Sequence, residues 1–164
     1  MRITKKWLSE KSACLDAVEW VLAQGISDPL ELLRRAIAEN HCDWANWGIC
    51  RIFNRKQRIQ YACFASRQIL ATYEKQYPGD LCPRQTIEVA ERCILHNTKK
   101  NRAYAVNAAY SAAKAAYAVN AAYFAAYYAA SAAYSAAKAA KDEKLEKILH
   151  YGISLLTNRE EEKK

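Results

Sequence analysis

The chain has 164 residues, of which 52% are hydrophobic and 26% are charged, and its net charge is +8. This apolar content excludes a disordered chain, and the length allows one domain to bury a core without disulfide staples. Four glycines and three prolines are few for this length, and apolar residues rarely alternate with period two. We therefore expect an all-α protein, a compact bundle of five to seven helices.

Two helices are expected near the N-terminus, over residues 12–25 and 27–40. In the first, apolar side chains recur at helical spacing and Gly25 is placed to end the helix. Its spaced positions are Cys14, Ala17, Val18, Val21 and Leu22. The second has Ser27 or Asp28 as its N-cap and Pro29 in its first turn. Its expected buried stripe is Leu30, Leu33 and Ile37.

Three further helices follow in chain order. Over residues 41–53 Asp43 is the expected N-cap, and Trp44, Trp47 and Cys50 share one face. Over residues 58–77 the apolar face comprises Ile59, Cys63, Ser66, Leu70 and Tyr73, and the residues PGD at 78–80 stop the helix. The fifth starts at Pro83 and turns Ile87, Ala90 and Ile94 inward.

An alanine- and tyrosine-rich tract occupies residues 103–141, and its composition strongly favours a helix. Small residues from Ala108 to Ala140 follow one another at steps of three and four, which predicts one close helix contact. A helix over residues 99–140 would be roughly 60 Å long, longer than the roughly 40 Å span of a compact domain. Whether this line of alanines packs on the chain's own helices or on a partner stays open, as does a homodimer through it.

The last apolar stripe is Leu145, Ile148, Leu149 and Leu156. We expect one all-α domain over residues 1–156. It comprises bundle helices over 13–98, the Ala/Tyr-rich helix over 99–141 and a C-terminal helix over 142–156. Residues 157–164 are expected to be a frayed tail.

The six cysteines are scattered without a CxxC pair, so the spacing of a zinc site is absent. We expect buried reduced thiols, no metal and no cofactor, and therefore a cytoplasmic protein. The N-terminus lacks the apolar core of a signal peptide, and polar residues interrupt the Ala/Tyr tract, so we expect neither a leader nor a membrane span.

No catalytic residue is expected, and the chain does not look like an enzyme. His41, Cys42 and Asp43 are adjacent, but neighbours in a turn point in different directions and form no relay by adjacency. A pair assembled from distant residues, such as Cys42 or Cys63 with His96, stays open.

Basic residues are concentrated in an acid-free stretch between Asp43 and Glu74, with a second cluster, KKNR, at 99–102. The stretch contains Arg51, Arg55, Lys56, Arg58 and Arg67. Such a patch attracts an acidic protein surface or nucleic acid. An ordinary solvated surface is the simpler reading.

Several short motifs occur in a defined order: ACLDAVEWV, CDWANWGICRIF, YACFASRQIL, PRQTIEVAERC and then the Ala/Tyr tract. Together they resemble the predicted all-α immunity proteins of polymorphic toxin systems, in the group numbered five, which also occur in phage genomes. The motif positions are Cys14, Trp20, Asp43, Trp44, Trp47, Cys63, Arg67, Pro83, Arg84, Glu88, Ala90 and Glu91. Ser66 and Cys93 depart from the pattern, where alanine and an aromatic residue are usual.

The resemblance implies a binding protein that neutralises a toxin or effector protein by covering it. Three alternatives stay open: inhibition of a bacterial defence protein by a phage-borne relative, sequestration of a nucleotide signal, and nucleic-acid binding. The expected contact surface joins tyrosines of the tract to the basic segment: Tyr110, Tyr117, Tyr123, Tyr127, Tyr128, Tyr134, Arg51, Arg55, Lys56 and Arg58. Asp43, Trp44 and Trp47 are expected to be structural, as a cap and two core anchors.

Overall fold

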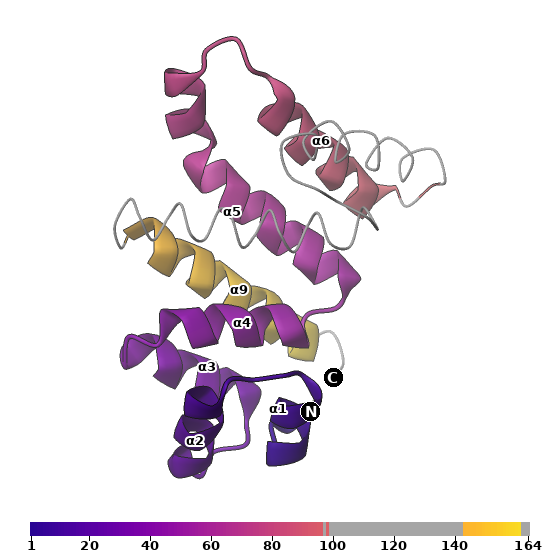
Figure 1. Cartoon of the computed structure of the whole chain (residues 1–164). Coiled ribbons are helices and arrows are strands. Elements are labelled where there is room, and N and C mark those ends of the chain that lie inside the picture. Colours follow the sequence, from indigo (N-terminus) through magenta and orange to yellow (C-terminus); the bar gives the residue numbers. More distant parts are fainter. Residues whose placement is uncertain (97, 99–142, 162–164) are drawn as a thin grey trace. The chain divides into compact units, whose positions relative to one another are not determined.

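A computed structural model describes residues 1–96, 98 and 143–161 of the chain. Seven α-helices and no strand occur among these residues (Figure 1), which confirms the all-α class and the expected number of helices. The Ala/Tyr-rich helix predicted over residues 99–141 lies outside them. So do the six tyrosines of the expected contact surface.

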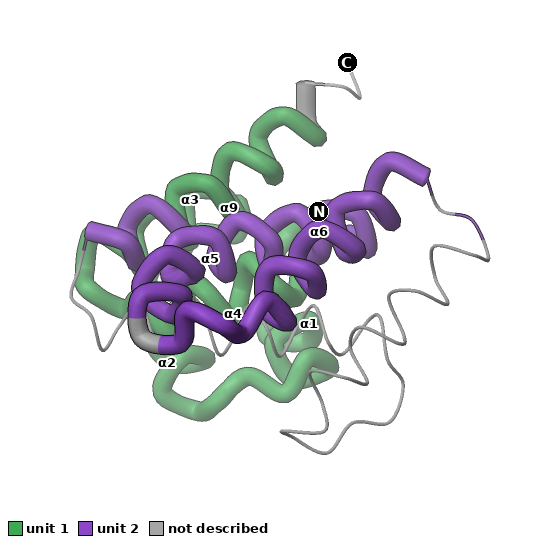
Figure 2. Tube along the Cα trace, turned by 90° about the horizontal axis from the view of Figure 1, so that it is seen from above, with its two compact units in different colours: residues 1–53, 149–164 green, residues 54–148 purple. Residues whose placement is uncertain are grey.

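The chain divides into two compact units, shown in separate colours in Figure 2. Unit 1 comprises residues 1–53 and 149–164, and unit 2 comprises residues 54–148. The boundary therefore falls within the last helix, after Ile148. The single domain expected over residues 1–156 stays a prediction, and the two units are described separately below.

Unit 1 begins with a short helix that the sequence pattern did not reveal, α1 (Lys5–Glu10). The Thr4 hydroxyl accepts a hydrogen bond from the Trp7 amide and so caps this helix. Helix α2 (Leu15–Gln24) follows and ends, as predicted, at Gly25, which adopts a left-handed conformation with φ of 65°. A six-residue helix is too short to show a repeating apolar pattern, which explains why α1 was missed.

Helices α3 (Pro29–Ala38) and α4 (Cys42–Ile52) complete the N-terminal part of unit 1. As predicted, Pro29 opens α3, and the Asp28 carboxylate caps it by accepting a hydrogen bond from the Glu31 amide at 2.8 Å. The expected cap of α4 was wrong. His41 is the N-cap, and Asp43 lies inside the first turn, where its negative charge still favours the positive end of the helix dipole.

Burial within unit 1 corrects part of the predicted apolar faces. Cys14 is the exposed N-cap of α2, and Leu22 is 48% exposed. Ala17 is the one residue of this helix that is fully buried. In α3 Leu30 and Leu33 are buried as predicted, whereas Ile37 is half-buried. The buried residues Ile3, Leu8 and Leu32 form one hydrophobic cluster of the unit.

Unit 2 contains a helical hairpin, in which α5 (Arg55–Gln76) and α6 (Cys82–Leu95) run in opposite directions (Figure 1). A capping box starts α5 three residues before the predicted position: the Asn54 side chain accepts from the Gln57 amide at 2.9 Å, and the Gln57 side chain accepts from the Asn54 amide at 3.0 Å. The core between the helices is Ile59, Cys63, Leu70 and Ile87, with Ala90 and Ile94 packed against it.

Polar contacts tie the two helices of the hairpin together. The Arg67 guanidinium donates two hydrogen bonds to the Glu91 carboxylate, at 2.7 and 2.6 Å, and Arg84 donates two to Glu74, both at 2.7 Å. Next to the connecting turn the Tyr73 hydroxyl donates to Asp80 at 2.7 Å. Paired hydrogen bonds of this kind fix the register of α5 against α6.

The last described helix is α9 (Glu143–Glu161). Leu145, Ile148, Leu149 and Leu156 are buried as predicted, and Ile153 joins them. The frayed tail expected from residue 157 was wrong for residues 157–161, which continue the helix. None of the described helices combines the length and apolar character that a membrane span requires.

Candidate functional site: an aromatic pocket in unit 1

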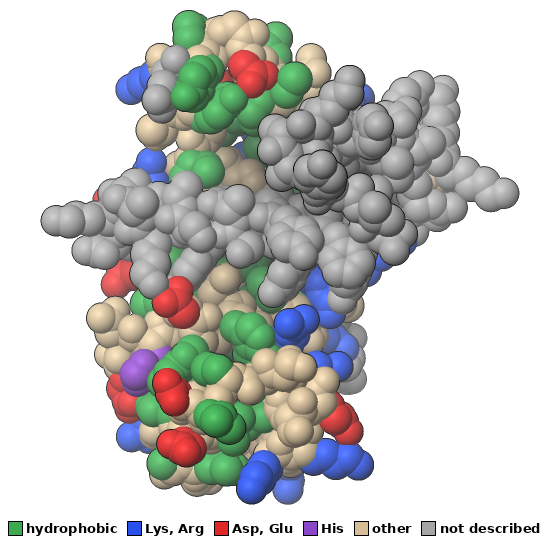
Figure 3. Space-filling model, viewed as in Figure 1, with side chains coloured by type: hydrophobic (Ala, Val, Ile, Leu, Met, Phe, Trp, Pro, Cys, Tyr) green, Lys and Arg blue, Asp and Glu red, His purple; other side chains and the backbone are tan. Residues whose placement is uncertain are grey.

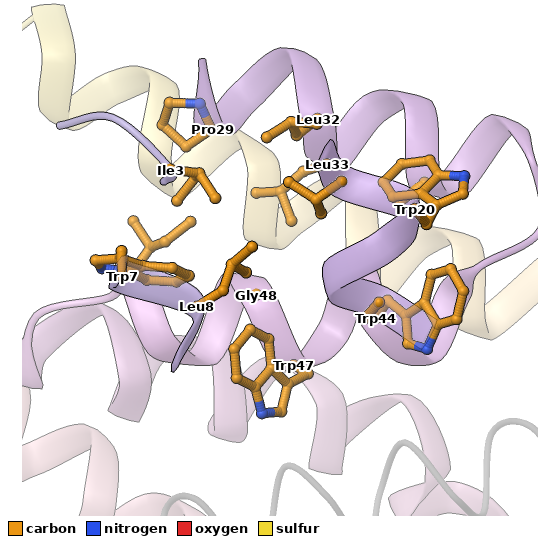
Figure 4. A pocket seen from close by; sticks show the side chains of 14 residues that line it. Ile3, Trp7, Leu8, Trp20, Pro29, Leu32, Leu33, Trp44, Trp47 and Gly48 are labelled. Carbon is orange, nitrogen blue, oxygen red and sulfur yellow. The ribbon is translucent and has the colours of Figure 1, made fainter. Parts of the chain in front are cut away.

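Helices α1 to α4 of unit 1 enclose a pocket with a volume of about 50 Å³ (Figure 4). Its wall is apolar throughout and contains all four tryptophans of the chain: Trp7, Trp20, Trp44 and Trp47. In Figure 4, Ile3, Trp7 and Leu8 lie toward one end of the pocket, and Trp20 and Trp44 lie at the other. A pocket built by four helices collects residues that are far apart in the sequence.

The aromatic rings hold one another in defined orientations. Trp7 meets Trp47 edge to face, with ring centroids 6.0 Å apart. At the other end Trp20 lies 5.8 Å from Trp44, and the His41 ring stacks on Trp44 at 4.1 Å. Edge-to-face and offset pairs of this kind each contribute about 0.5–1.5 kcal/mol beyond their burial. The indoles are therefore held in position by their neighbours.

Charged groups of both signs surround the apolar wall. The Trp20 indole N–H donates a hydrogen bond to the Glu39 carboxylate at 2.8 Å, and Arg35 donates to the same carboxylate at 3.0 Å. Both hydrogen bonds lower the pKa of Glu39 below its usual value, and the bond from Trp20 has the larger effect. The Arg51 guanidinium lies 5.5 Å from the centre of the Trp47 ring, within cation–π range.

All four tryptophans are partly buried, neither fully enclosed nor fully exposed. Figure 3 shows hydrophobic side chains at the surface among charged ones over the part of the molecule formed by α1 to α4. Trp44 and Trp47 were expected to be core anchors. Trp47 does pack against the hydrophobic cluster of unit 1, and it also lines the pocket together with Trp44. A partly exposed indole offers an apolar face together with an N–H donor, which is why tryptophan is frequent at binding surfaces.

A close approach of α3 and α4 forms part of the pocket. Gly48 on α4 faces Leu33 on α3, and a Cβ at position 48 would lie only 3.0 Å from the Leu33 Cδ2 methyl. Ala45, one turn earlier, is completely buried. Small residues on α4 therefore let the two helices pack closely beneath the tryptophans.

The basic residues of the expected contact surface are divided between the two units. Arg51 is half-buried in unit 1, whereas Arg55, Lys56 and Arg58 belong to unit 2. Arg55 and Lys56 are exposed, and Arg58 is half-buried. The predicted combination of these residues with the tyrosines of the tract lies partly outside the described residues, so it stays a prediction.

The remaining motif residues lie in the pocket wall, in the α5–α6 hairpin or at the surface. Trp20 lies in the pocket wall, Arg67 and Arg84 hold the α5–α6 hairpin together, and Glu88 is exposed. Cys63 lies in the hairpin core, where burial, followed by the charge of Glu91, raises the pKa of its thiol to about 12. Such a thiol is protonated at neutral pH and is a poor nucleophile.

All six cysteines are free thiols, but only Cys50, Cys63 and Cys93 are buried. The expectation of buried thiols therefore holds for half of them. No group of three or more His, Cys, Asp or Glu side chains in the described parts of the chain is arranged to hold a metal ion.

The pocket itself was not predicted from the sequence. Trp44 and Trp47 were recognised as one face of a helix, but Ile3, Trp7 and Leu8 come from a segment in which no helix was expected. The available signal was the restriction of all four tryptophans to residues 7–47.

No family model, curated protein or solved structure matches this chain. The resemblance to immunity proteins consequently rests on the short sequence motifs alone.

Proposed function

We propose that this chain is a non-enzymatic binding protein, an immunity-like inhibitor that neutralises a toxin or effector protein by direct contact. The supporting observation is the set of four partly buried tryptophans around one apolar pocket. Tryptophan, with tyrosine and arginine, is enriched among the few residues that carry most of the binding energy in protein interfaces. The neighbouring Arg35, Glu39 and Arg51 resemble the polar rim of such an interface.

The size of the pocket favours a protein side chain over a metabolite as its occupant. About 10–15 Å³ of such space holds one water-sized group, so about 50 Å³ accommodates the three or four carbons of a valine, leucine or isoleucine side chain. Sites for small molecules typically measure about 300–1,000 Å³. A partner that inserts one branched aliphatic side chain fits these dimensions.

The chemistry of the wall argues in the same direction. A nucleotide needs donors or cations for its phosphates, and every residue that lines the pocket is apolar. This pocket is therefore poorly suited to bind a nucleotide signal. A toxin and a bacterial defence protein present the same kind of surface, so the identity of the captured partner decides between these two targets.

The test is affinity capture from the native host with three baits: the wild-type chain, Ala17→Leu and Ala23→Leu. Ala17 lies on α2 in the pocket wall, and leucine there fills the space from inside. Ala23 lies on the exposed face of the same helix and serves as the matched control. We expect a stoichiometric protein partner with the wild type and with Ala23→Leu, and its loss with Ala17→Leu.

Thermal unfolding of each bait shows whether the substitution is tolerated. If Ala17→Leu does not fold, Ala36→Val fills the pocket from α3 instead. A partner that binds both pocket-filled baits as well as the wild type would contradict the proposed site. A co-purified nucleotide, seen as excess absorbance at 260 nm that is lost on denaturation, would instead support sequestration of a signal.

A further inference from the structure

The net positive charge of the chain belongs to one of its two units. Residues 1–53 and 149–164 contain ten lysines and arginines and ten acidic residues, so unit 1 is neutral. Residues 54–148 contain fifteen basic and seven acidic residues, which gives unit 2 the whole net charge of +8. The aromatic pocket and the basic excess therefore belong to different units.

Within the α5–α6 hairpin most acidic side chains are occupied by structural contacts. Glu74 and Glu91 are paired with Arg84 and Arg67, and Asp80 accepts hydrogen bonds from the Tyr73 hydroxyl and the Cys82 amide. Of the four acidic residues of the hairpin, this leaves Glu88 outside such contacts. None of these acids pairs with Arg55 or Lys56 at the start of α5.

The most concentrated cations of the hairpin lie in the first turn of α5, and we call Arg55, Lys56 and Arg58 the basic turn. This turn contains no acidic residue, and the sequence has none between Asp43 and Glu74. Arg55 and Lys56 are exposed and form no ion pair with a described residue.

Three cations at this position oppose the stability of the helix. The N-terminal end of a helix carries a partial positive charge, so acidic residues are favoured there and basic ones are unfavourable. An anionic partner removes the conflict, because it is attracted both by the side chains and by the end of the helix.

We propose that the basic turn of unit 2 binds the phosphate backbone of nucleic acid, without reading its sequence. The cores of protein interfaces are enriched in aromatic residues and depleted of lysine, and the basic turn has no aromatic residue. Interfaces with nucleic acid are more polar and much more positively charged. Gln60, in the next turn of α5, is partly exposed, and amide side chains are common in contacts to phosphate and sugar.

This binding is independent of the proposed protein partner and is measured on the purified full-length chain alone. The probes are fluorescein-labelled 20-nucleotide single-stranded DNA, duplex DNA and single-stranded RNA, followed by fluorescence anisotropy between 50 and 300 mM salt. The variant is the double substitution Arg55→Gln and Lys56→Gln. Because both side chains are exposed and oppose the helix dipole, their loss should not impair folding.

The matched control removes two exposed cations from unit 1, through Lys5→Gln and Lys6→Gln. We expect the wild type and this control to bind with similar affinity. The basic-turn variant should bind at least about tenfold more weakly at 0.1 M salt, and its slope of log K against log salt should be smaller by about two. Unlabelled polyglutamate should compete poorly, since it carries charge but no phosphates.

Three results would overturn the proposal. One is the absence of binding to all three probes at 50 mM salt. Another is an equal loss of affinity in the unit 1 control. The third is competition by polyglutamate as strong, per charge, as that by unlabelled DNA, which would identify the basic turn as a site for an acidic protein.

Discussion

The cysteine thiols differ strongly in how their surroundings affect their reactivity. Cys14 is exposed at the start of α2, whereas Cys63 is buried and its pKa is raised to about 12. Cys82 is exposed, but its hydrogen bond to Asp80 raises the pKa of its thiol. Since the thiolate is the reactive form, these differences in exposure and surroundings predict different reactivities for the three cysteines.

We therefore expect Ellman's reagent at pH 8 to modify Cys14 first, Cys82 more slowly and Cys63 only after unfolding. Peptide mass spectrometry of samples taken over time identifies each site. Rapid modification of Cys63 in the folded chain would show that the hairpin core is open.

Gly25 is another residue whose identity is set by its backbone. Its φ of 65° is unfavourable for a side chain, so Gly25→Ala should destabilise the protein by about 1 kcal/mol. Gly79→Ala is the matched control, because a Cβ at position 79 meets no atom within 4 Å and its φ is not in the left-handed region. Chemical denaturation measures both, and equal effects would contradict the assigned role of Gly25.

Single residues also show where sequence reasoning reached its limit. Gly25 and Pro29 were placed correctly, because their backbone preferences are local properties. Asp43 was assigned as a cap, but α4 starts at Cys42 and His41 takes that position. Capping preference alone locates a helix start only to within a few residues, since tertiary packing shifts the boundary.

At the scale of elements, the α5–α6 hairpin is stabilised by packing and by two ion pairs between its helices, Arg67 with Glu91 and Arg84 with Glu74. The Arg67 and Glu91 side chains are 41% and 36% exposed, so solvent screening limits their contribution. A double-mutant cycle with Arg67→Ala and Glu91→Ala should give a coupling free energy of about 0.5–1 kcal/mol, favourable and weaker in high salt. A coupling of zero would show that the pair has no effect on stability.

The same pair predicts a dependence on pH. The hydrogen bond from Arg67 lowers the pKa of Glu91 below its ordinary value of 4.5. A folded-state pKa below the unfolded one means that the pair stabilises the hairpin above about pH 4.5, and that this stability is lost as the pH falls through the folded-state pKa. Glu91→Gln should therefore be less stable than the wild type at pH 7, and the difference should shrink in acid. A difference that grows in acid would contradict this assignment.

Six of the seven described helices were anticipated, and their buried faces largely followed the apolar spacing. Long helices such as α5 and α6 show the repeat several times, which is why Ile59, Leu70 and Ile87 were assigned correctly. Helix α1 was missed because six residues contain too little of the repeat. The ion pairs of the hairpin were not predicted, since they depend on the register of one helix against the other.

At the scale of the whole molecule, two properties are segregated between the units. All four tryptophans belong to unit 1 and the net positive charge belongs to unit 2. From the sequence we predicted one contact surface that combines basic residues with tyrosines of the Ala/Tyr tract. The sequence did not reveal the pocket, because its wall combines residues from four helices, one of which was not predicted.

The central claim is that the aromatic pocket of unit 1 receives an aliphatic side chain of a protein partner. The most direct measurement is the dissociation constant of the captured partner, determined by calorimetry for the wild type, Ala17→Leu and Ala23→Leu. Filling a pocket that holds a dominant contact should cost at least about 2 kcal/mol of binding free energy, or about 30-fold in affinity. We predict such a loss for Ala17→Leu and less than about threefold for Ala23→Leu. Equal affinities for the wild type and a folded Ala17→Leu variant would contradict the account.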